Sequence, residues 1–247
     1  MNIVIILAGG VGRRVGADRP KQFVEIFGKP ILAYTVEIFQ RNPRIDAIEI
    51  VSHNDWIEYC KSMCSKYGLS KVKWLTRGGR TFQESVIRGI RNLESMVKTN
   101  GENGNIKLSD NIFIHYAAAP FTSQKIVNAV IDMTEERGSA VTGTPCFQLI
   151  GTRDDESHSL HYVNRDNYIQ IACPYGFRFD YLLDLYKRGE ENHLIATVEP
   201  HTTSLMYALG DRINYTYGDQ TNIKITTQED LRLFKEVVLL KERLEHK

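Results

Sequence analysis

Three things are scarce in this sequence of 247 residues: cysteine, net charge and an extended apolar start. The four cysteines, Cys60, Cys64, Cys146 and Cys173, are scattered, and no second ligand pair at zinc spacing accompanies Cys60 and Cys64. The sequence therefore argues against a zinc site or a disulfide framework and favours ordinary buried or half-buried thiols.

The formal net charge is +1, so the chain as a whole has no electrostatic attraction for nucleic acid or for a membrane surface. Any basic site must be local. The first apolar run, Ile3–Leu7, has five residues and leads into glycines, which is too short for a signal-peptide core or a membrane-spanning helix. We therefore expect a soluble cytoplasmic protein with no nucleic-acid or membrane partner.

The pattern of apolar residues predicts alternating strands and helices in a single α/β domain over residues 1–247, of which 42% are hydrophobic. In chain order we expect strand 3–7, helix 30–41, strand 47–52, helix 55–67, strand 72–75, helix 81–93, strand 111–115 and helix 123–137. This alternation predicts a Rossmann-like three-layer α/β sandwich with a mostly parallel, twisted sheet. In such a fold, ligands bind beyond the carboxyl ends of the strands.

From Ser139 to about Tyr168 the pattern changes to strand-like runs separated by polar turns such as Asp154-Asp155-Glu156. This stretch predicts a β excursion from the domain. A simple surface hairpin on a monomer is one interpretation of it.

A glycine-rich, basic segment follows the first predicted strand. Gly9, Gly10 and Gly12 have no Cβ atoms, so successive backbone N–H groups can approach a polyanion closely. The nearby basic side chains are Arg13, Arg14, Arg19 and Lys21. Gly10-Val11-Gly12 is followed by Arg13-Arg14-Val15, so neither the dinucleotide fingerprint nor a P-loop is completed. The segment predicts a phosphate site of another kind, the alternative being an ordinary βα turn with solvated arginines.

Two further motifs follow predicted strands and so should lie at the same edge of the sheet. Gly78-Gly79-Arg80-Thr81 and Ser85 stand at a helix start, where they offer donors and acceptors for the edge of a pyrimidine. The alternative is that Thr81 and Ser85 only cap the helix. The second motif is His115–Pro120, which ends a strand.

The segment Leu7–Arg14, followed by Pro20-Lys21-Gln22-Phe23, resembles the signature of nucleotidyltransferases that join a nucleoside triphosphate to a phosphorylated small molecule. Its Pro-Lys-Gln-Phe variant is similar to the cytidylyltransferases that act on methylerythritol phosphate in isoprenoid synthesis and on ribitol phosphate in teichoic-acid or capsule synthesis. The resemblance covers nearly the whole chain. It implies an enzyme that joins CTP to a polyol phosphate, with Mg²⁺ as cofactor, and a homodimer that exchanges β-arms, here residues 139–170.

The resemblance also implies roles for individual residues. The implied nucleotide site comprises Leu7, Ala8, Gly9, Gly10, Val11, Gly12, Arg13, Arg14, Lys21, Gly78, Gly79, Arg80, Ser85, Ala117 and Ala118. Arg14, Lys21 and Lys224 would neutralise the charge that grows during phosphoryl transfer, and Arg165 of the partner's arm would clamp the acceptor phosphate. Thr202 and Thr203 lie in the implied acceptor segment. No general base is needed, because a phosphate dianion is already nucleophilic.

Two departures from the family pattern leave the metal ligands and the acceptor open. Where relatives have His-Asp-Ala-Ala-Arg-Pro, this chain has Tyr116 in place of the aspartate and Ala119 in place of the arginine, which removes a metal ligand and a cation. Where relatives have an acidic pair that reads a polyol, this chain has Pro200 and His201. A different acceptor, such as a phosphonate or a capsule precursor, and a non-catalytic nucleotide-binding relative are the alternatives.

Overall fold

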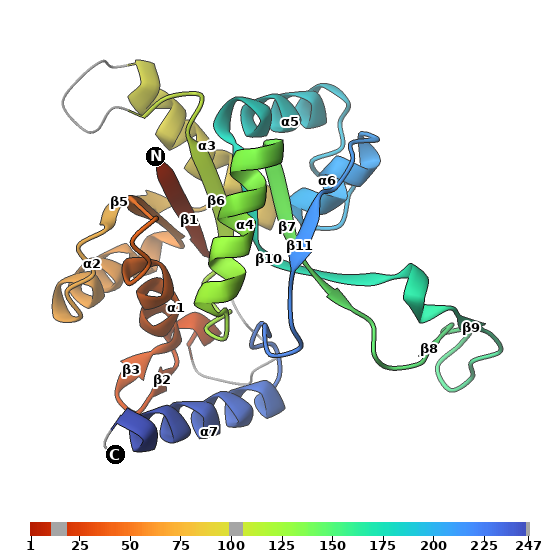
Figure 1. Ribbon diagram of the computed structural model, residues 1–247. Helices are drawn as coiled ribbons and strands as arrows, with labels where there is room; N and C mark the ends of the chain where they lie inside the picture. The colour runs from red at the N-terminus through yellow and green to blue at the C-terminus, as the bar shows by residue number, and fades with distance from the viewer. Residues whose placement is uncertain (11–18, 99–105, 246–247) are drawn as a thin grey trace.

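The computed structural model describes residues 1–10, 19–98 and 106–245. Across these residues a seven-stranded sheet forms the centre of the molecule, in the order β11-β7-β10-β6-β1-β4-β5 (Figure 1). The strands of this sheet are β1 (Asn2–Ala8), β4 (Ala47–Ser52), β5 (Val72–Arg77), β6 (Asn111–Tyr116), β7 (Ser139–Pro145), β10 (Ile169–Arg178) and β11 (Tyr215–Tyr217). Two short hairpins accompany it, β2 (Glu25–Ile26) with β3 (Lys29–Pro30), and β8 (Ile150–Gly151) with β9 (Tyr162–Val163).

Most neighbours in the central sheet are parallel, as the sequence predicts. Strand β1 pairs in parallel with β4 and β6, β4 with β5, and β7 with β11, whereas β10 runs antiparallel to both β6 and β7. Alternate residues of β1 enter two different cores, Ile3 and Ile5 on one face and Val4 and Ile6 on the other. Burial on both faces explains why such a strand is a continuous apolar run.

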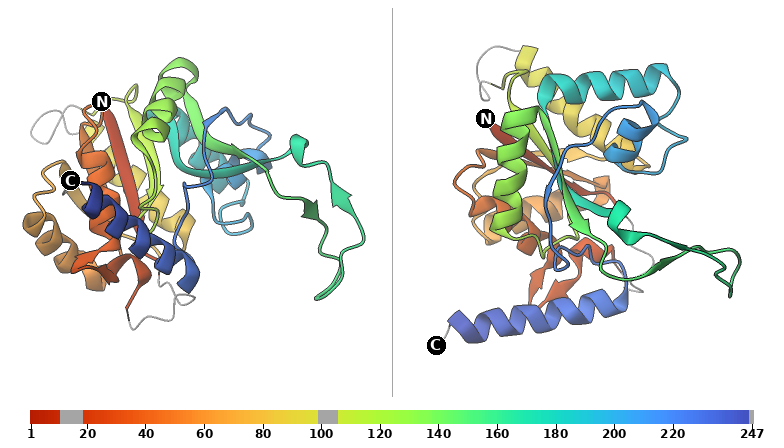
Figure 2. Two further views of the ribbon diagram at one scale, coloured as in Figure 1. Left: turned by 60° about the horizontal axis from the view of Figure 1, so that its bottom comes forward. Right: turned by 45° about the vertical axis from the view of Figure 1, so that its right-hand side comes forward.

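Helices cover both faces of the sheet and confirm the predicted three-layer arrangement (Figure 2). One face is packed by α3 (Phe82–Lys98), α5 (Phe179–Glu191) and α6 (Thr202–Ala208), and the other by α1 (Ile31–Gln40), α2 (Ile57–Lys66) and α4 (Gln124–Arg137). The last helix, α7 (Gln228–Glu245), packs Leu231 and Phe234 against Ile31 and Ala118. Three short 3₁₀ turns complete the described elements: η2 (Lys21–Phe23), η3 (Asn54–Trp56) and η4 (Arg165–Asn167). None of the helices in the described parts of the chain is long and apolar enough to cross a bilayer.

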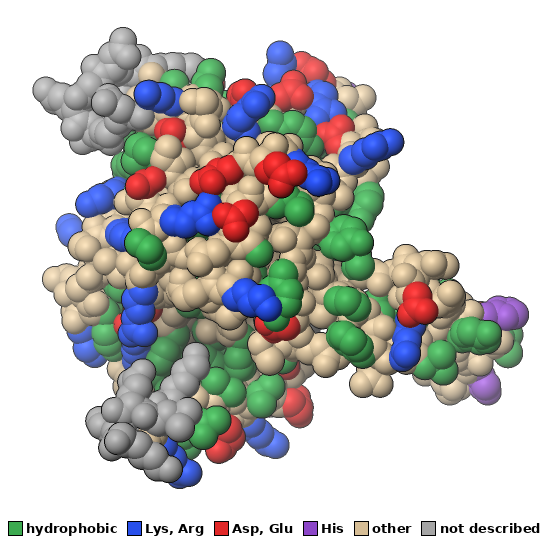
Figure 3. Space-filling view, in the orientation of Figure 1, with side chains coloured by type: hydrophobic (Ala, Val, Ile, Leu, Met, Phe, Trp, Pro, Cys, Tyr) green, Lys and Arg blue, Asp and Glu red, His purple; other side chains and the backbone are tan. Residues whose placement is uncertain are grey.

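The segment between β7 and β10 projects from the body of the molecule in every ribbon view (Figures 1 and 2). Both β7 and β10 belong to the central sheet, because their backbones pair with each other and β10 also pairs with β6. The sequence predicts a β excursion over residues 139–170. In the structure the first and last residues of this stretch belong to the central sheet, and only residues 146–168 form the projecting arm. Several apolar side chains are exposed on this arm among polar and charged ones, with Leu149, Leu160 and Tyr162 each more than 70% exposed. Figure 3 shows hydrophobic side chains along it, together with charged ones and histidines.

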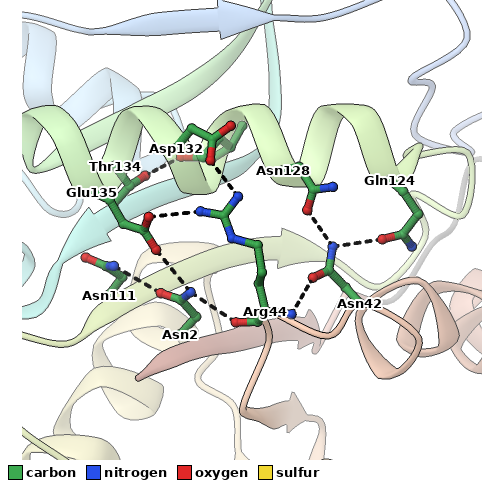
Figure 4. Close-up of polar contacts among 10 residues, drawn as sticks. Asn2, Asn42, Arg44, Asn111, Gln124, Asn128, Asp132, Thr134 and Glu135 are labelled. Carbon is green, nitrogen blue, oxygen red and sulfur yellow. Dashed lines mark hydrogen bonds and ion pairs between the residues drawn. The ribbon is translucent and has the colours of Figure 1, made fainter.

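A polar network ties the loop before β4 to α4, on the side of the sheet that α1 and α2 also cover (Figure 4). Arg44 places one guanidinium nitrogen 2.5 Å from Asp132 and the other 2.9 Å from Glu135, both on α4. The buried Asn42 donates through Nδ2 to Gln124 at 2.8 Å and to Asn128 at 2.9 Å. The network thus fixes the helix that begins directly after the His115–Pro120 motif.

Candidate active site

A cavity of about 230 Å³ opens at the carboxyl ends of β1 and β6, beside the start of α3. Most of the predicted nucleotide-site residues in the described parts of the chain line it, namely Leu7, Gly9, Gly10, Lys21, Gly79, Arg80, Ser85, Ala117 and Ala118, together with Lys224. Ala8 and Gly78 are the chain neighbours of lining residues. Val11, Gly12, Arg13 and Arg14 lie outside the described residues.

Gln22 holds the glycine end of β1 in place. Its side-chain amide donates to the carbonyl oxygen of Ala8 at 2.6 Å and to that of Gly10 at 2.8 Å, and the residue is 3% exposed. The next residue, Phe23, is fully buried and stacks on Trp56 with ring centroids 4.2 Å apart. These contacts anchor η2, so Lys21 at its start borders the cavity on a fixed support. Gln22 stands in the Pro20-Lys21-Gln22-Phe23 motif, but its contacts could not be predicted from the sequence, because its partners are backbone carbonyls.

The turn before α3 is closed by its own hydrogen bonds. Ser85 Oγ accepts from Gly79 N at 3.1 Å and donates to the carbonyl of Thr81 at 2.9 Å. Thr81 Oγ1 accepts from Glu84 N at 3.1 Å and so caps the helix, and Glu84 accepts from Arg80 N at 2.7 Å, one residue before the cap. A Cβ atom on Gly79 would lie 2.2 Å from Glu84 Cβ, so the turn requires glycine at that position.

The cavity is cationic. Lys21, Arg80 and Lys224 line it, and none of its described lining residues is an aspartate or a glutamate. Lys224 Nζ lies 4.2 Å from the centroid of the Tyr116 ring, a cation–π arrangement. The segment that carries Lys224 is held at the end of β6, because Ile225 N donates to the carbonyl of Ala118 at 2.8 Å.

Tyr116 joins the two places where the sequence departs from the family pattern. Its hydroxyl is hydrogen-bonded to His201 Nδ1 and lies 3.4 Å from the Tyr175 hydroxyl, and its ring packs 5.6 Å from that of Phe82. Burial raises the pKa of Tyr116 above its ordinary range, so the phenol stays protonated. In the described chain, no group of three or more His, Cys, Asp or Glu side chains could hold a metal ion. The described residues that line the cavity offer a divalent cation no carboxylate ligand.

Residues 2–240 match the sequence model of a known family, 2-C-methyl-D-erythritol 4-phosphate cytidylyltransferase (IspD). The chain belongs to this family. It is a cytidylyltransferase.

Within the family, the chain is similar to enzymes with two different names. It is 31% identical to the ribitol-5-phosphate cytidylyltransferase of Lacticaseibacillus paracasei, over 98% of this chain and 100% of that one. It is 35% identical to the 2-C-methyl-D-erythritol 4-phosphate cytidylyltransferase of Clostridium beijerinckii, over 93% of this chain and 94% of that one.

Solved structures with the family's name share the fold. The crystal structure of 2-C-methyl-D-erythritol 4-phosphate cytidylyltransferase from Francisella tularensis superposes with a TM-score of 0.74 at 25% identity, covering 94% of this chain and 97% of that one. A crystal structure of 4-diphosphocytidyl-2C-methyl-D-erythritol synthase gives a TM-score of 0.77 at 22% identity, over 96% of this chain and 97% of that one.

Three residues that the family resemblance assigned to the acceptor lie away from the cavity of their own chain. Thr202 is fully buried, and its hydroxyl is 3.0 Å from that of Tyr186; Thr203 is 5% exposed in the same helix, α6. Both pack inside the protein, so neither hydroxyl lines the cavity. Arg165 lies on the projecting arm, where Nη1 donates to the carbonyl of Phe147. A role for Arg165 at a partner's site stays a prediction.

Proposed function

We propose that this cytidylyltransferase joins CTP to a polyol phosphate, such as ribitol 5-phosphate or 2-C-methyl-D-erythritol 4-phosphate, and releases pyrophosphate. The observation that carries the proposal is the cavity itself, where the glycine end of β1 and the Gly79–Ser85 turn meet three cationic side chains. The names of the relatives agree with it, since both kinds of relative transfer the cytidylyl group to a phosphorylated polyol.

In the proposed reaction, an oxygen of the acceptor phosphate attacks the α-phosphorus of CTP. The bond from this phosphorus to the oxygen that bridges the α- and β-phosphates breaks, and pyrophosphate leaves. Both reactants are anions, so the protein must position them and stabilise the charge that develops in the transition state. Lys21, Arg80 and Lys224 can do this with full charges, and the N–H groups of Gly9 and Gly10 with partial ones. Arg14 is expected to assist.

The hydrogen bonds of Ser85 favour cytosine over uracil. A hydroxyl has one donor and two acceptor positions, and Ser85 Oγ already donates to Thr81 and accepts from Gly79. One acceptor position remains, and it suits the amino group of cytosine but not the carbonyl that uracil carries at the same place.

We therefore expect CTP to bind more tightly than UTP by about tenfold or more, the loss that follows when a buried polar group is left unpaired. We expect CTP also to bind more tightly than ATP or GTP, because a purine needs more room than a pyrimidine in a cavity of about 230 Å³. Calorimetric titration of the four nucleotides measures this. Equal affinities for CTP and UTP would mean that Ser85 does not read the base, and equal affinities for CTP and ATP would mean that the cavity captures only phosphates. In Ser85→Ala we expect the preference for CTP over UTP to be lost. Ser62→Ala is the matched control, because Ser62 is exposed on α2.

Magnesium is proposed to enter with the nucleotide. The described lining residues offer it no carboxylate, and Mg²⁺ is often held by substrate phosphates and several waters. We expect Tyr116→Asp, which places a carboxylate at the end of β6, to lower the magnesium concentration needed for half-maximal rate by severalfold. A magnesium titration of both proteins measures it, and an unchanged half-maximal concentration would contradict this view. A variant that becomes active from an inactive wild type would instead favour a non-catalytic relative.

The deciding experiment for the proposed function is pyrophosphate release with CTP and a panel of acceptors. The panel contains ribitol 5-phosphate, 2-C-methyl-D-erythritol 4-phosphate, phosphorylated amino alcohols and phosphonates. Turnover with one or both polyol phosphates is the expected result. Turnover with a phosphonate alone would show that the acceptor is a phosphonate and not a polyol phosphate. If CTP binds but no acceptor is turned over, the proposed reaction is contradicted.

The projecting arm is proposed to mediate a homodimer in which Arg165 reaches the partner's cavity. Support comes from the exposed apolar side chains Phe147, Leu149 and Leu160 on the arm and from its extension away from the body of the molecule. Sedimentation measures the assembly directly. We also propose a cytoplasmic location, because CTP is an intracellular substrate.

A further inference from the structure

His201 lies beside the cavity and is tied to both of its walls. Its carbonyl oxygen accepts from Gln83 Nε2 at 3.1 Å, and Gln83 belongs to the first turn of α3, next to the residues that meet the base. Its ring is hydrogen-bonded through Nδ1 to Tyr116 at the end of β6, under Lys224. His201 therefore connects α3, which borders the proposed base site, with Tyr116, whose ring lies under the cation Lys224.

The backbone end of this connection is fixed by buried partners. Gln83 is 2% exposed, and its Oε1 accepts from the hydroxyl of Tyr186 at 2.7 Å, which in turn lies 3.0 Å from Thr202 Oγ1. A buried network with its donors and acceptors matched is rigid. The bond between the His201 ring and Tyr116 is thus the part of the connection that a proton can change.

The protonation states of Tyr116 and His201 decide which of the two residues donates the hydrogen bond between them. Tyr116 stays protonated and donates its hydroxyl hydrogen. Burial, with a further contribution from the ammonium of Lys224, lowers the pKa of His201, so at neutral pH the imidazole is uncharged and Nδ1 accepts. The other titratable groups that face the ring are Glu199, whose Oε1 lies 3.7 Å from Nε2, and Tyr175 behind Tyr116.

We propose that His201 is a positioning residue whose neutral imidazole holds the Tyr116 ring beneath the ammonium of Lys224, and that protonation of His201 undoes this arrangement. A proton on Nδ1 turns this nitrogen into a donor, so the Tyr116 oxygen must accept from it and the hydroxyl hydrogen must turn toward Tyr175, 3.4 Å away. The new positive charge also repels Lys224. The catalytic consequence rests on the proposed function, in which Lys224 meets the phosphates.

The first test is the pH dependence of kcat/KM in His201→Asn, because the Oδ1 of asparagine can accept the same bond but does not titrate. The phosphates of the substrates titrate in the same range, so the readout is the ratio of variant to wild-type rate at each pH. We expect this ratio to rise severalfold from pH 8 to pH 5.5, less than the roughly tenfold rise that a histidine with the ordinary pKa of about 6.5 would give. His193→Asn is the matched control, since His193 is exposed on the loop before α6, and its ratio should stay flat. A flat ratio for His201→Asn overturns the proposal.

The second test needs no turnover. In Tyr116→Phe the ring remains but the hydroxyl is gone, and since a hydrogen bond to the neutral imidazole disfavours its charged form, the pKa of His201 should rise. NMR titration of the histidine side chains in the protein without substrates measures this. An unchanged His201 titration overturns the proposal, even if His201→Asn does not fold. If no polyol phosphate is turned over but the titration shifts, the proposed function fails while the hydrogen bond stands.

Discussion

Replacing Lys21 by alanine should lower kcat by about 100-fold or more, the loss seen when one donor aimed at transition-state charge is removed. The physical reason is the support beneath the side chain. Gln22 and Phe23 anchor η2 through hydrogen bonds to Ala8 and Gly10 and through stacking on Trp56, so Lys21 is delivered to the cavity in a fixed place. Steady-state pyrophosphate release measures the effect.

The fold should be unaffected by this change, because Lys21 is not part of the buried core, and the melting temperature of Lys21→Ala should match that of the wild type. Lys61→Ala is a matched control, since Lys61 is exposed on α2. Lys21→Arg should recover part of the rate by restoring the charge. Unaltered kinetics in Lys21→Ala would show that this lysine is a surface charge without a role in the reaction.

The second large effect concerns stability and comes from Glu49, a fully buried carboxyl in the middle of β4. Its Oε1 accepts from Thr76 Oγ1 at 2.5 Å and from Asn92 Nδ2 at 2.8 Å, while Oε2 has no partner among the described residues. Burial raises the pKa of Glu49 from 4.5 to about 7, and the two hydrogen bonds only partly oppose it.

The sign of the pH effect follows from linkage. The folded state binds this proton more tightly than the unfolded state, so the stabilisation is fully present below pH 4.5 and is lost as the pH rises through about 7. The difference between the two pKa values corresponds to about 3 kcal/mol of unfolding free energy. We expect the wild type to lose this amount between pH 4.5 and pH 9.

Denaturant unfolding at several pH values measures the loss, and Glu49→Gln, which cannot ionise, should not show it. The exposed Glu58→Gln on α2 is the matched control and should follow the wild type. A Glu49→Gln protein with the same pH dependence as the wild type would mean that other groups account for it.

The sequence predicts the strands of the sheet well where both faces of a strand are buried. Strand β4 has the predicted bounds, 47–52, because polar residues on either side delimit a run that is buried on both faces and is apolar apart from Glu49 and Ser52. The strands β7 and β10 were harder to place. Strand β10 lies antiparallel between β6 and β7, and its partners in β6 are more than 50 residues away in the sequence. In addition, Pro174 and Gly176 lie inside β10, although both residue types are typical of strand ends.

The candidate site shows the same limit. Lys21, Ser85 and Lys224 were predictable, because they stand in motifs that resemble a family and follow strands. The contacts of Gln22 and His201 were not predictable, since only the fold creates them: Gln22 bonds two carbonyls of the strand end, and His201 bonds a tyrosine 85 positions away. Tyr116 and His201 each looked like an isolated departure in the sequence, yet in the structure they are one hydrogen-bonded pair.

The hydrogen bonds of the Gln22 amide affect which inhibitors the cavity can bind. Because its amide engages the carbonyls of Ala8 and Gly10, the phosphate side of the cavity is left with cations and N–H donors, and ligand atoms that accept hydrogen bonds are matched there. A compound with a sulfonyl or carboxylate head in place of the triphosphate suits that side, whereas an added amine does not. The rings of Phe82 and Tyr116, tilted by 46° to each other, also line the cavity and add apolar surface to it. An acidic head joined to an aromatic body is thus the scaffold that this cavity selects.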